Sequence, residues 1–213
     1  MTTPETSRPH PLSRLPPCAE LDKFLEERVE HPERANEIDA KIMKEFETET
    51  SIFVLDMSGF SRTVQRYGII HYLAMIRRMR RIVRPAVEEN GGAVVKYDAD
   101  NVFAIFPDPD CALKAAIDVN HDLEIANLVT ADESDVYVCI GIGHGRILLA
   151  CDDMYGDEMN LASKLGEDVA EKKEILLTSN AHGKLKDRSR KFQKLPLTVS
   201  GVTLEMFKLT ADA

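Results

Sequence analysis

The sequence lacks a long hydrophobic run. No window of its 213 residues approaches the roughly 18 consecutive apolar residues that a membrane-spanning helix requires. The first residues also lack the layout of a secretory signal, in which charged residues precede an apolar stretch. We therefore expect no membrane span and a cytoplasmic location.

Cysteine is scarce and shows no metal-binding pattern. None of the four cysteines stands in a Cys-x-x-Cys pair or has histidine partners at the intervals of a zinc finger. Two of them, Cys111 and Cys139, lie in apolar runs, which predicts buried, reduced thiols.

Positive charge is also in short supply. Lysine and arginine number 27 against 36 aspartates and glutamates, giving a net charge of −9. Because binding to a nucleic-acid backbone needs concentrated positive charge, this balance argues against nucleic acid as a partner. It does not exclude a nucleotide substrate, whose metal ions carboxylates can bind.

Composition divides the chain into three parts. Residues 1–17 contain five prolines and predict a disordered leader. Residues 18–48 are charged and helical, with two short apolar stripes separated by Pro32. Helices this polar must bury their stripes against a partner, either the domain that follows or a second subunit. We assign residues 49–210 to one globular domain.

Hairpins and helical crossovers alternate within this domain, which predicts an α+β layer with a mixed sheet. Predicted strands cover residues 51–55, 93–97, 101–106, 136–142, 146–150, 175–177 and 198–209, and predicted helices cover residues 69–88, 111–128, 159–170 and 179–185.

Two aspartates follow predicted strands. Asp56 ends the first strand, and Asp100 lies in the tight turn of the hairpin. Carboxylates on adjacent strand ends can share a cation, and such oxygen ligands suit Mg²⁺ or Mn²⁺. Ser58-Gly59-Phe60 then opens a helix, whose free N–H groups suit a phosphate. Taken alone, this segment is equally a strand-to-helix turn with a helix cap.

Four segments, in order, resemble motifs of class III adenylate and guanylate cyclase catalytic domains, as found in soluble bacterial proteins. They are Leu55-Asp56-Met57-Ser58-Gly59-Phe60-Ser61, the hairpin from Gly91-Gly92 through Lys96 to Asp100, Gly141-Ile142-Gly143-His144-Gly145, and Tyr155-Gly156-Asp157 through Asn160 to Leu165. The resemblance implies the α+β fold of that family, a mixed sheet with a ferredoxin-like βαββαβ core and helices mainly on one face. The N-terminal helical segment would precede it.

The resemblance also implies roles for individual residues. Asp56 and Asp100 match the aspartates that bind two ions of Mg²⁺ or Mn²⁺ per site. Lys96 and Asp153 match the pair that reads the base, and together they favour adenine. Asn160 matches the residue that orients the ribose. In this family the metal pair and the other three residues come from different subunits, which implies a homodimer with two composite sites.

Three positions depart from the family pattern. Lys164 stands where the family has an arginine that stabilises the transition state, and a single ammonium cannot replace the planar fork of a guanidinium. Ser200 replaces a lysine, and Ala99 replaces the glycine before the second aspartate. The change at Ala99 is minor unless the hairpin needs a positive φ there. The first two departures predict reduced activity.

Arginines crowd the predicted helix 69–88, at positions 77, 78, 80, 81 and 84. We interpret them as a solvated helix face paired with the acidic surface, although one of them could replace a missing phosphate ligand.

The predicted function is therefore an adenylate cyclase that converts ATP into 3′,5′-cyclic AMP and pyrophosphate by two-metal chemistry. Three alternatives stay open at this point. The chain could be a nucleotide-binding regulatory module of the same fold, a guanylate cyclase, or a cyclase restrained by its N-terminal helices.

Overall fold

The structure is a computed structural model that describes residues 18–150, 152–199 and 201–210. The predicted leader, residues 1–17, and the substitution at Ser200 lie outside the described residues.

The described chain alternates helices and strands, as the sequence predicts for an α+β protein. The helices are α1 (Cys18–Glu30), α2 (Ala35–Phe46), α3 (Phe60–Tyr67), α4 (Ile69–Glu89), α5 (Pro109–Asn127), α6 (Asp157–Ser163) and α7 (Ser179–Lys184). The strands are β1 (Glu47–Met57), β2 (Ala93–Asp98), β3 (Asn101–Phe106), β4 (Val138–Ala150), β5 (Asp153–Tyr155), β6 (Ile175–Thr178), β7 (Phe192–Val199) and β8 (Val202–Leu209). Single 3₁₀ turns cover Pro32–Arg34 and Asp132–Ser134, and a π-helical segment, Lys164–Val169, continues α6.

The strands form one mixed sheet in the order β2-β3-β1-β4-β6-β8-β7, and β5 pairs with β4. β1 is antiparallel to both β3 and β4, while β4 and β6 are parallel. The first part of the chain runs β1-α3/α4-β2-β3-α5-β4, which is the predicted ferredoxin-like βαββαβ core. This prediction is confirmed.

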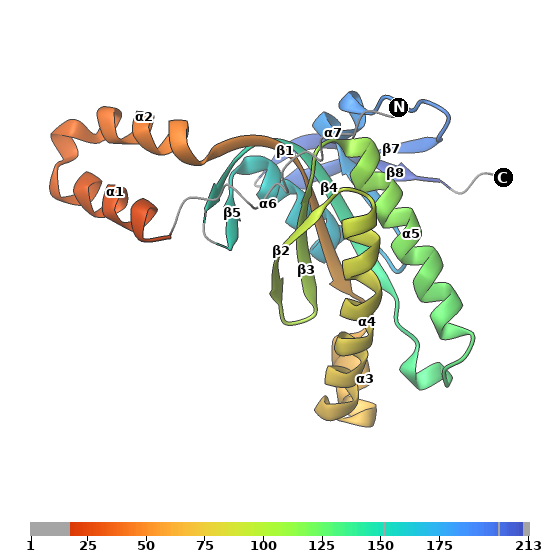
Figure 1. The fold of residues 1–213 in the computed structure, drawn as a ribbon. Coiled ribbons are helices and arrows are strands. Elements are labelled where there is room, and N and C mark those ends of the chain that lie inside the picture. Colours follow the sequence, from red (N-terminus) through yellow and green to blue (C-terminus); the bar gives the residue numbers. More distant parts are fainter. Residues whose placement is uncertain (1–17, 151, 200, 211–213) are drawn as a thin grey trace, which may run out of the picture.

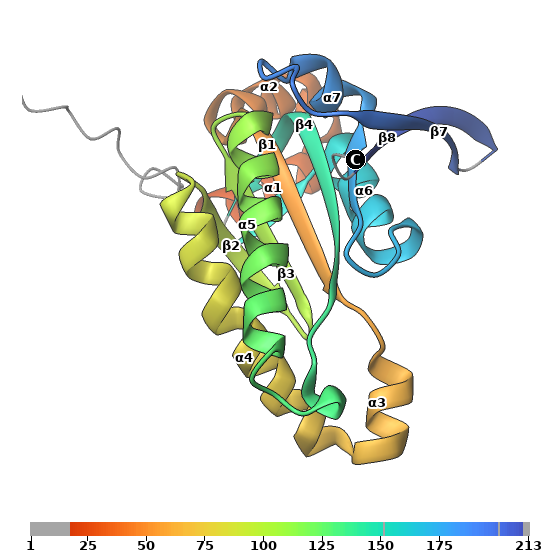
Figure 2. The ribbon, with the colours of Figure 1, turned by 90° about the vertical axis from the view of Figure 1, so that its right-hand side faces the viewer.

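The two faces of the sheet carry different helices (Figure 2). Side chains alternate across a strand, so Phe53 and Leu55 of β1 point to one face and Ile52 and Val54 to the other. The long helices α4 and α5 cover the first face and form the main core with it. The short α6 packs on the second face through Met159 and Ala162.

Glycines in β4 make room for α6. The sequence analysis expected two strands, 136–142 and 146–150, with a glycine turn between them; instead β4 is continuous through Gly141, Gly143 and Gly145. A Cβ atom at Gly141 would lie 2.2 Å from the carbonyl oxygen of Ala162, far inside contact distance. These glycines therefore permit close helix-on-sheet packing, and they do not turn the chain. The short β5 and most of β7 were not predicted either. Three residues are too few to show an alternation, and in β7 Pro196 stands between the alternating Leu195 and Leu197.

The helices α1 and α2 form a hairpin that projects from the domain (Figure 1). Its buried residues, Leu21, Ile38, Ile42 and Phe46, pack with Ala150 and Leu148 of β4. The predicted stripes are thus buried in part, between the two helices and against the end of β4, while Leu25 and Met43 are each 45% exposed. α2 passes directly into β1, so any movement of the hairpin would act on the strand that carries Asp56.

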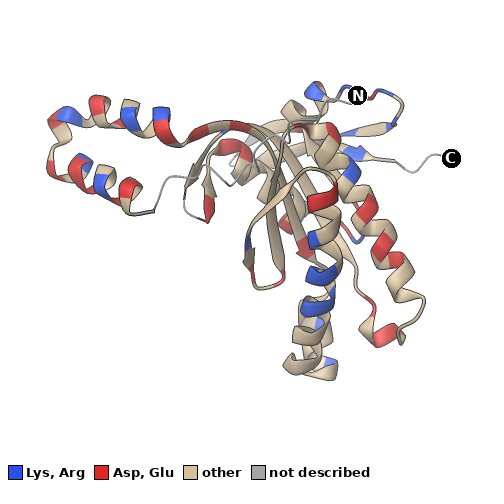
Figure 3. Ribbon diagram, viewed as in Figure 1, with Lys and Arg blue, Asp and Glu red and all other residues tan. Residues whose placement is uncertain are grey.

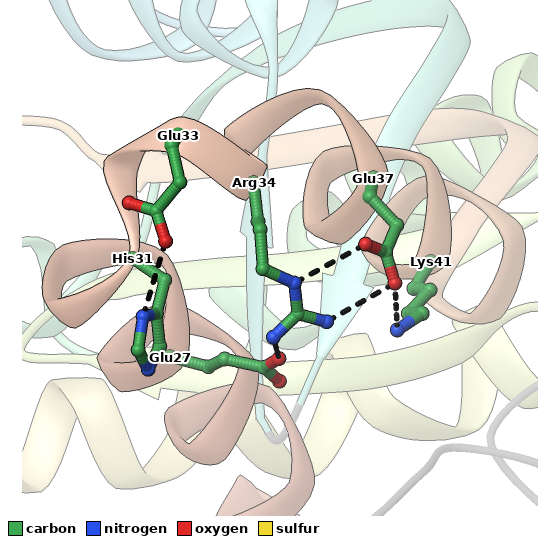
Figure 4. A network of polar contacts seen from close by, with 6 residues as sticks. All are labelled: Glu27, His31, Glu33, Arg34, Glu37 and Lys41. Atoms are coloured by element: carbon green, nitrogen blue, oxygen red, sulfur yellow. Dashed lines mark hydrogen bonds and ion pairs between the residues drawn. The ribbon is translucent and has the colours of Figure 1, made fainter.

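A charged network joins the two helices of the hairpin on their exposed side (Figure 4). The Arg34 guanidinium lies 2.6 Å from a carboxylate oxygen of Glu27 on α1 and 3.1 Å from one of Glu37 on α2. Lys41 reaches Glu37 at 2.8 Å, and His31 lies 3.3 Å from Glu33. Hydrogen bonds from Arg34, and then from Lys41, lower the pKa of Glu37 to about 2. Because solvent screens such exposed ion pairs, they contribute little to the free energy of folding.

Both cysteines whose surroundings are described are unpaired thiols, as predicted. Cys139 is buried at 6% exposure and Cys111 is partly buried. Burial is the first cause that raises the pKa of each thiol to about 11.

Basic residues gather along α4 (Figure 3). The interpretation of this cluster as a solvated face is wrong for part of it. Arg78 donates hydrogen bonds to the side-chain oxygen of Asn127 and to the carbonyl of Ser134, which ties α4 to the end of α5 and to the loop after it. Arg84, in contrast, is exposed and pairs with Glu88 at 2.8 Å.

Candidate active site

Asp56 and Asp100 lie close together at one end of the sheet. Asp56 is the last but one residue of β1, and Asp100 immediately precedes β3. Because Leu55 of β1 pairs with Val102 of β3, the register brings the two aspartates to the same end. Burial, then the negative charge of Asp100, then that of Glu167 raise the pKa of Asp56 to about 7.

A hollow of about 1190 Å³ opens beside these carboxylates, large enough for a nucleotide. Its lining includes both aspartates together with Ser58, Gly59 and Phe60. The structure therefore gathers five of the predicted site residues around one space.

The turn before α3 presents the start of that helix to the hollow. Gly59 caps it with φ +97°, a left-handed conformation that glycine adopts without strain. The N–H groups of the first turn of a helix have no partner within the helix and can bind an anion. The backbone N–H of Ser58, however, donates to the carbonyl of Tyr137 at 2.9 Å, so it is already used.

Lys96 and Asp153 meet on the face of the sheet that carries α6. Lys96 Nζ lies 2.8 Å from Asp153 Oδ1 and 4.8 Å from the centre of the Phe103 ring. A β-bulge produces this placement: Val94 pairs with Ala104 and Lys96 with Phe103, so Val95 is an extra residue. In a regular strand, side chains two residues apart point to the same face of the sheet. Without the bulge, Lys96 would therefore share the face of Val94, which is covered by the long helices α4 and α5.

Asn160 and Lys164 lie one turn apart, at the end of α6. Asn160 is exposed, and its N–H donates to the carbonyl of Gly156 at 3.0 Å. Lys164 begins the π-helical segment and pairs with Asp168 at 2.7 Å. The Lys164 ammonium is therefore already paired with a carboxylate.

The predicted site residues thus fall into two groups within one chain. Lys96, Asp153, Asn160 and Lys164 are not among the residues that line the hollow. Glu167, which the sequence did not mark as a site residue, interacts with members of both groups. Its charge contributes to the raised pKa of Asp56. Burial raises the pKa of Glu167 itself, while a hydrogen bond with Ser163 and, to a smaller extent, the charge of Lys96 lower it.

The carboxylates suit a divalent cation that is shared with a nucleotide. Within residues 18–150, 152–199 and 201–210, no three histidine, cysteine, aspartate or glutamate side chains form a metal-binding group. Mg²⁺ is commonly held by one or two carboxylates, with substrate phosphates and water completing its shell. Asp56 and Asp100 fit that kind of site.

The family profile of the adenylate and guanylate cyclase catalytic domain matches residues 42–210. This chain belongs to that family. The match begins within α2 and ends at the last described residue, so it covers the whole sheet.

Solved structures of cyclases have the same fold as this cyclase domain. The adenylate/guanylate cyclase/hydrolase of Silicibacter pomeroyi is 27% identical, with a TM-score of 0.69 over 78% of this chain and 98% of that one. The adenylyl cyclase CyaB of P. aeruginosa is 18% identical, with a TM-score of 0.66 over 78% of this chain and 96% of that one. At such identity the second likeness shows the fold alone.

Among curated proteins, the terminal-differentiation-specific adenylate cyclase of Dictyostelium discoideum is 25% identical over 128 residues, 54% of this chain and 6% of that protein. The matches span less than a third of the length of the curated relatives, from 6% to 28%. The family includes enzymes for both ATP and GTP, so membership shows a nucleotidyl cyclase domain without fixing its base.

None of the described helices is both long enough and apolar enough to cross a membrane.

The raised pKa of Asp56 predicts that its ionisation destabilises the fold. In the unfolded chain this carboxyl ionises near pH 4, but in the folded chain it ionises near pH 7. The folded state therefore holds more protons between these values, and stability falls as the pH rises from about 4 to about 7. We expect Asp56→Asn to raise the Tm at pH 8 by about 3–6 °C, allowing for partial exposure.

The measurement is thermal unfolding of both proteins from pH 4 to pH 8 without divalent cations. Wild type should lose stability relative to Asp56→Asn across this range. Parallel curves for the two proteins would show that the carboxyl titrates normally.

Proposed function

We propose that this cyclase domain is an adenylate cyclase, which converts ATP into 3′,5′-cyclic AMP and pyrophosphate at the interface of a homodimer. The observation that carries the choice of base is the Lys96–Asp153 pair, with a donor and an acceptor 2.8 Å apart.

The edge of adenine presents an acceptor, N1, beside a donor, the N6 amino group. An ammonium and a carboxylate held side by side match that order, Lys96 donating to N1 and Asp153 accepting from N6. Guanine presents a donor at N1 and an acceptor at O6, so the order along its edge is reversed. Asp153 is oriented by the N–H of Met154, which donates to its Oδ1 at 2.8 Å.

Separation of the two residue groups supports a homodimer. In a two-fold symmetric pair, each hollow can receive the base-reading and ribose-orienting residues of the other copy. Asn160 is exposed and Lys96 and Asp153 are partly exposed, so all three can meet a second subunit.

The residues of the chain then divide the work of an internal displacement. The ribose 3′-hydroxyl gives its proton to water and its oxygen bonds to the α-phosphorus. The bond from that phosphorus to the oxygen bridging the β-phosphate breaks, and pyrophosphate leaves with this oxygen. Asp56 and Asp100 would hold two ions of Mg²⁺ or Mn²⁺, which when bound activate the 3′-hydroxyl and neutralise phosphate charge. The start of α3 binds phosphate, Asn160 orients the ribose, and Lys164 offsets part of the developing charge.

The ion pair of Lys164 with Asp168 favours a slow enzyme, because the ammonium must leave a carboxylate to meet the phosphates. The same observation keeps a regulatory module that binds nucleotide without turnover as the second candidate function. Restraint by the α1–α2 hairpin is compatible with an active enzyme, since α2 continues into β1.

Cyclic nucleotide production tests the proposal. Purified protein should form cyclic AMP from ATP with Mn²⁺ or Mg²⁺, and Asp56→Ala should abolish it because a metal carboxylate is lost. Product is quantified by chromatography with ATP and GTP in parallel. Cyclic GMP as the main product would contradict the roles of Lys96 and Asp153, and a folded protein that binds ATP without any product would favour the regulatory module.

Replacing Lys164 by arginine, the residue of the family pattern, should speed the reaction. If a planar fork supplies about 2 kcal/mol more than an ammonium in the transition state, Lys164→Arg raises kcat by more than about tenfold. Lys114→Arg is the matched control, since Lys114 also pairs with an aspartate four residues on, at 2.6 Å, on the surface of α5. Equal rates for wild type and both variants would show that a guanidinium at position 164 has no advantage over an ammonium in the transition state.

A further inference from the structure

Tyr72 of α4 is buried against the metal carboxylates. Its side chain is 1% exposed, and its hydroxyl donates a hydrogen bond to Asp100 Oδ2 at 2.7 Å. The same hydroxyl lies 3.5 Å from the carbonyl oxygen of Met57, the residue after Asp56. A single phenol therefore spans the two strand ends that carry the proposed metal ligands.

The ring of Tyr72 also supports the proposed phosphate turn. It packs edge-on against Phe60, the first residue of α3, with ring centres 4.9 Å apart. Phe60 is 47% exposed, and its ring contacts that of Tyr72. Tyr72 thus contacts three separate segments, each of which carries part of the candidate site.

A second residue of α4 holds the turn before Asp100. Ala99 has φ +46°, so the hairpin does need the left-handed conformation that the family supplies with glycine. An alanine in this conformation is strained. Arg80 donates a hydrogen bond to the carbonyl of Ala99 at 2.5 Å, and its guanidinium lies 4.5 Å from the centre of the Tyr97 ring. Arg80 lies two turns along α4 from Tyr72, so one helix holds the hairpin at two points.

Holding Asp100 in place has a physical purpose. Two carboxylates in a partly buried site repel each other, and an exposed turn would let Asp100 swing away from Asp56. A phenol is protonated at neutral pH, so the Tyr72 hydroxyl donates to the Asp100 carboxylate. The hydrogen bond fixes one oxygen of Asp100 and leaves the other for a cation.

We infer that Tyr72 is a positioning residue, which holds the Asp100 carboxylate beside Asp56 before a divalent cation binds, while Arg80 secures the turn. The inference rests on the proposed function, since it assigns Asp100 to the cation. Tyr72 does not touch substrate in this arrangement and acts only through Asp100.

Mn²⁺ binding to the full chain tests this role. Free Mn²⁺ is measured by electron paramagnetic resonance during titration at a fixed concentration of the α,β-methylene analogue of ATP, which cannot be cyclised. The Mn²⁺ that the same concentration of analogue binds without protein is subtracted. Tyr72→Phe removes the hydrogen bond that holds the charged Asp100 carboxylate, so it should weaken Mn²⁺ binding about tenfold. The KM for Mn²⁺ should rise similarly in the cyclase assay, with kcat at saturating Mn²⁺ changed much less.

Two variants separate positioning from general loosening of the fold. Tyr97→Phe removes a hydroxyl that makes no hydrogen bond among the described residues, and it should bind Mn²⁺ like wild type. Val83→Ala removes buried volume about three turns further along α4, and it should lower the Tm while leaving Mn²⁺ affinity unchanged.

The outcomes distinguish failure of the proposed function from failure of the role proposed for Tyr72. If wild type binds no Mn²⁺ with the analogue, both the proposed function and this inference fail. If wild type binds Mn²⁺, Asp56→Ala does not, and Tyr72→Phe binds as tightly as wild type, the inference alone fails. Equal weakening in Tyr72→Phe and Val83→Ala would also overturn it.

Discussion

Strand β1 is bonded along both edges, to β3 over Ser51–Leu55 and to β4 over its whole length, Glu47–Met57. This pairing fixes the end of β1, where Asp56 stands, relative to the hairpin that carries Asp100. It also aligns the glycines of β4 under α6, and β4 in turn holds β5 with Asp153. The proposed metal carboxylates and the proposed base-reading pair therefore lie on one sheet, although only the carboxylates line the hollow.

The cost of this arrangement is electrostatic. Burying Asp56 next to Asp100 and Glu167 disfavours its charge, and the fold carries that penalty until a cation arrives. Tyr72 opposes the repulsion directly by binding Asp100, and Arg80 opposes the strain in the turn. A nucleotide with its metal ions would neutralise the carboxylates, so its binding would relieve the repulsion between Asp56 and its acidic neighbours.

The strand and hairpin patterns predicted an α+β protein with a mixed sheet and placed Asp56 and Asp100 on adjacent strand ends, because such patterns are local. The βαββαβ core followed from the resemblance to the cyclase family, whose four motifs occur in order. The sequence did not predict the bulge at Val95, which alone decides the face on which Lys96 lies. Nor did it reveal the continuous β4, since glycines that admit a helix look the same in sequence as glycines that turn a chain. Nothing in the sequence marks Tyr72, because its hydroxyl meets Asp100 only through the tertiary packing of α4.

The central claim is that one complete site needs two chains. It is tested by mixing two variants, Asp56→Ala and Lys96→Ala, each of which should be inactive alone because every site in its homodimer lacks a required group. In an equal mixture, half of the dimers would be mixed and each would hold one intact site, so activity should recover to about a quarter of wild type. Cyclic AMP formation by the mixture at this level would support the account, whereas a mixture as inactive as its parts would contradict it.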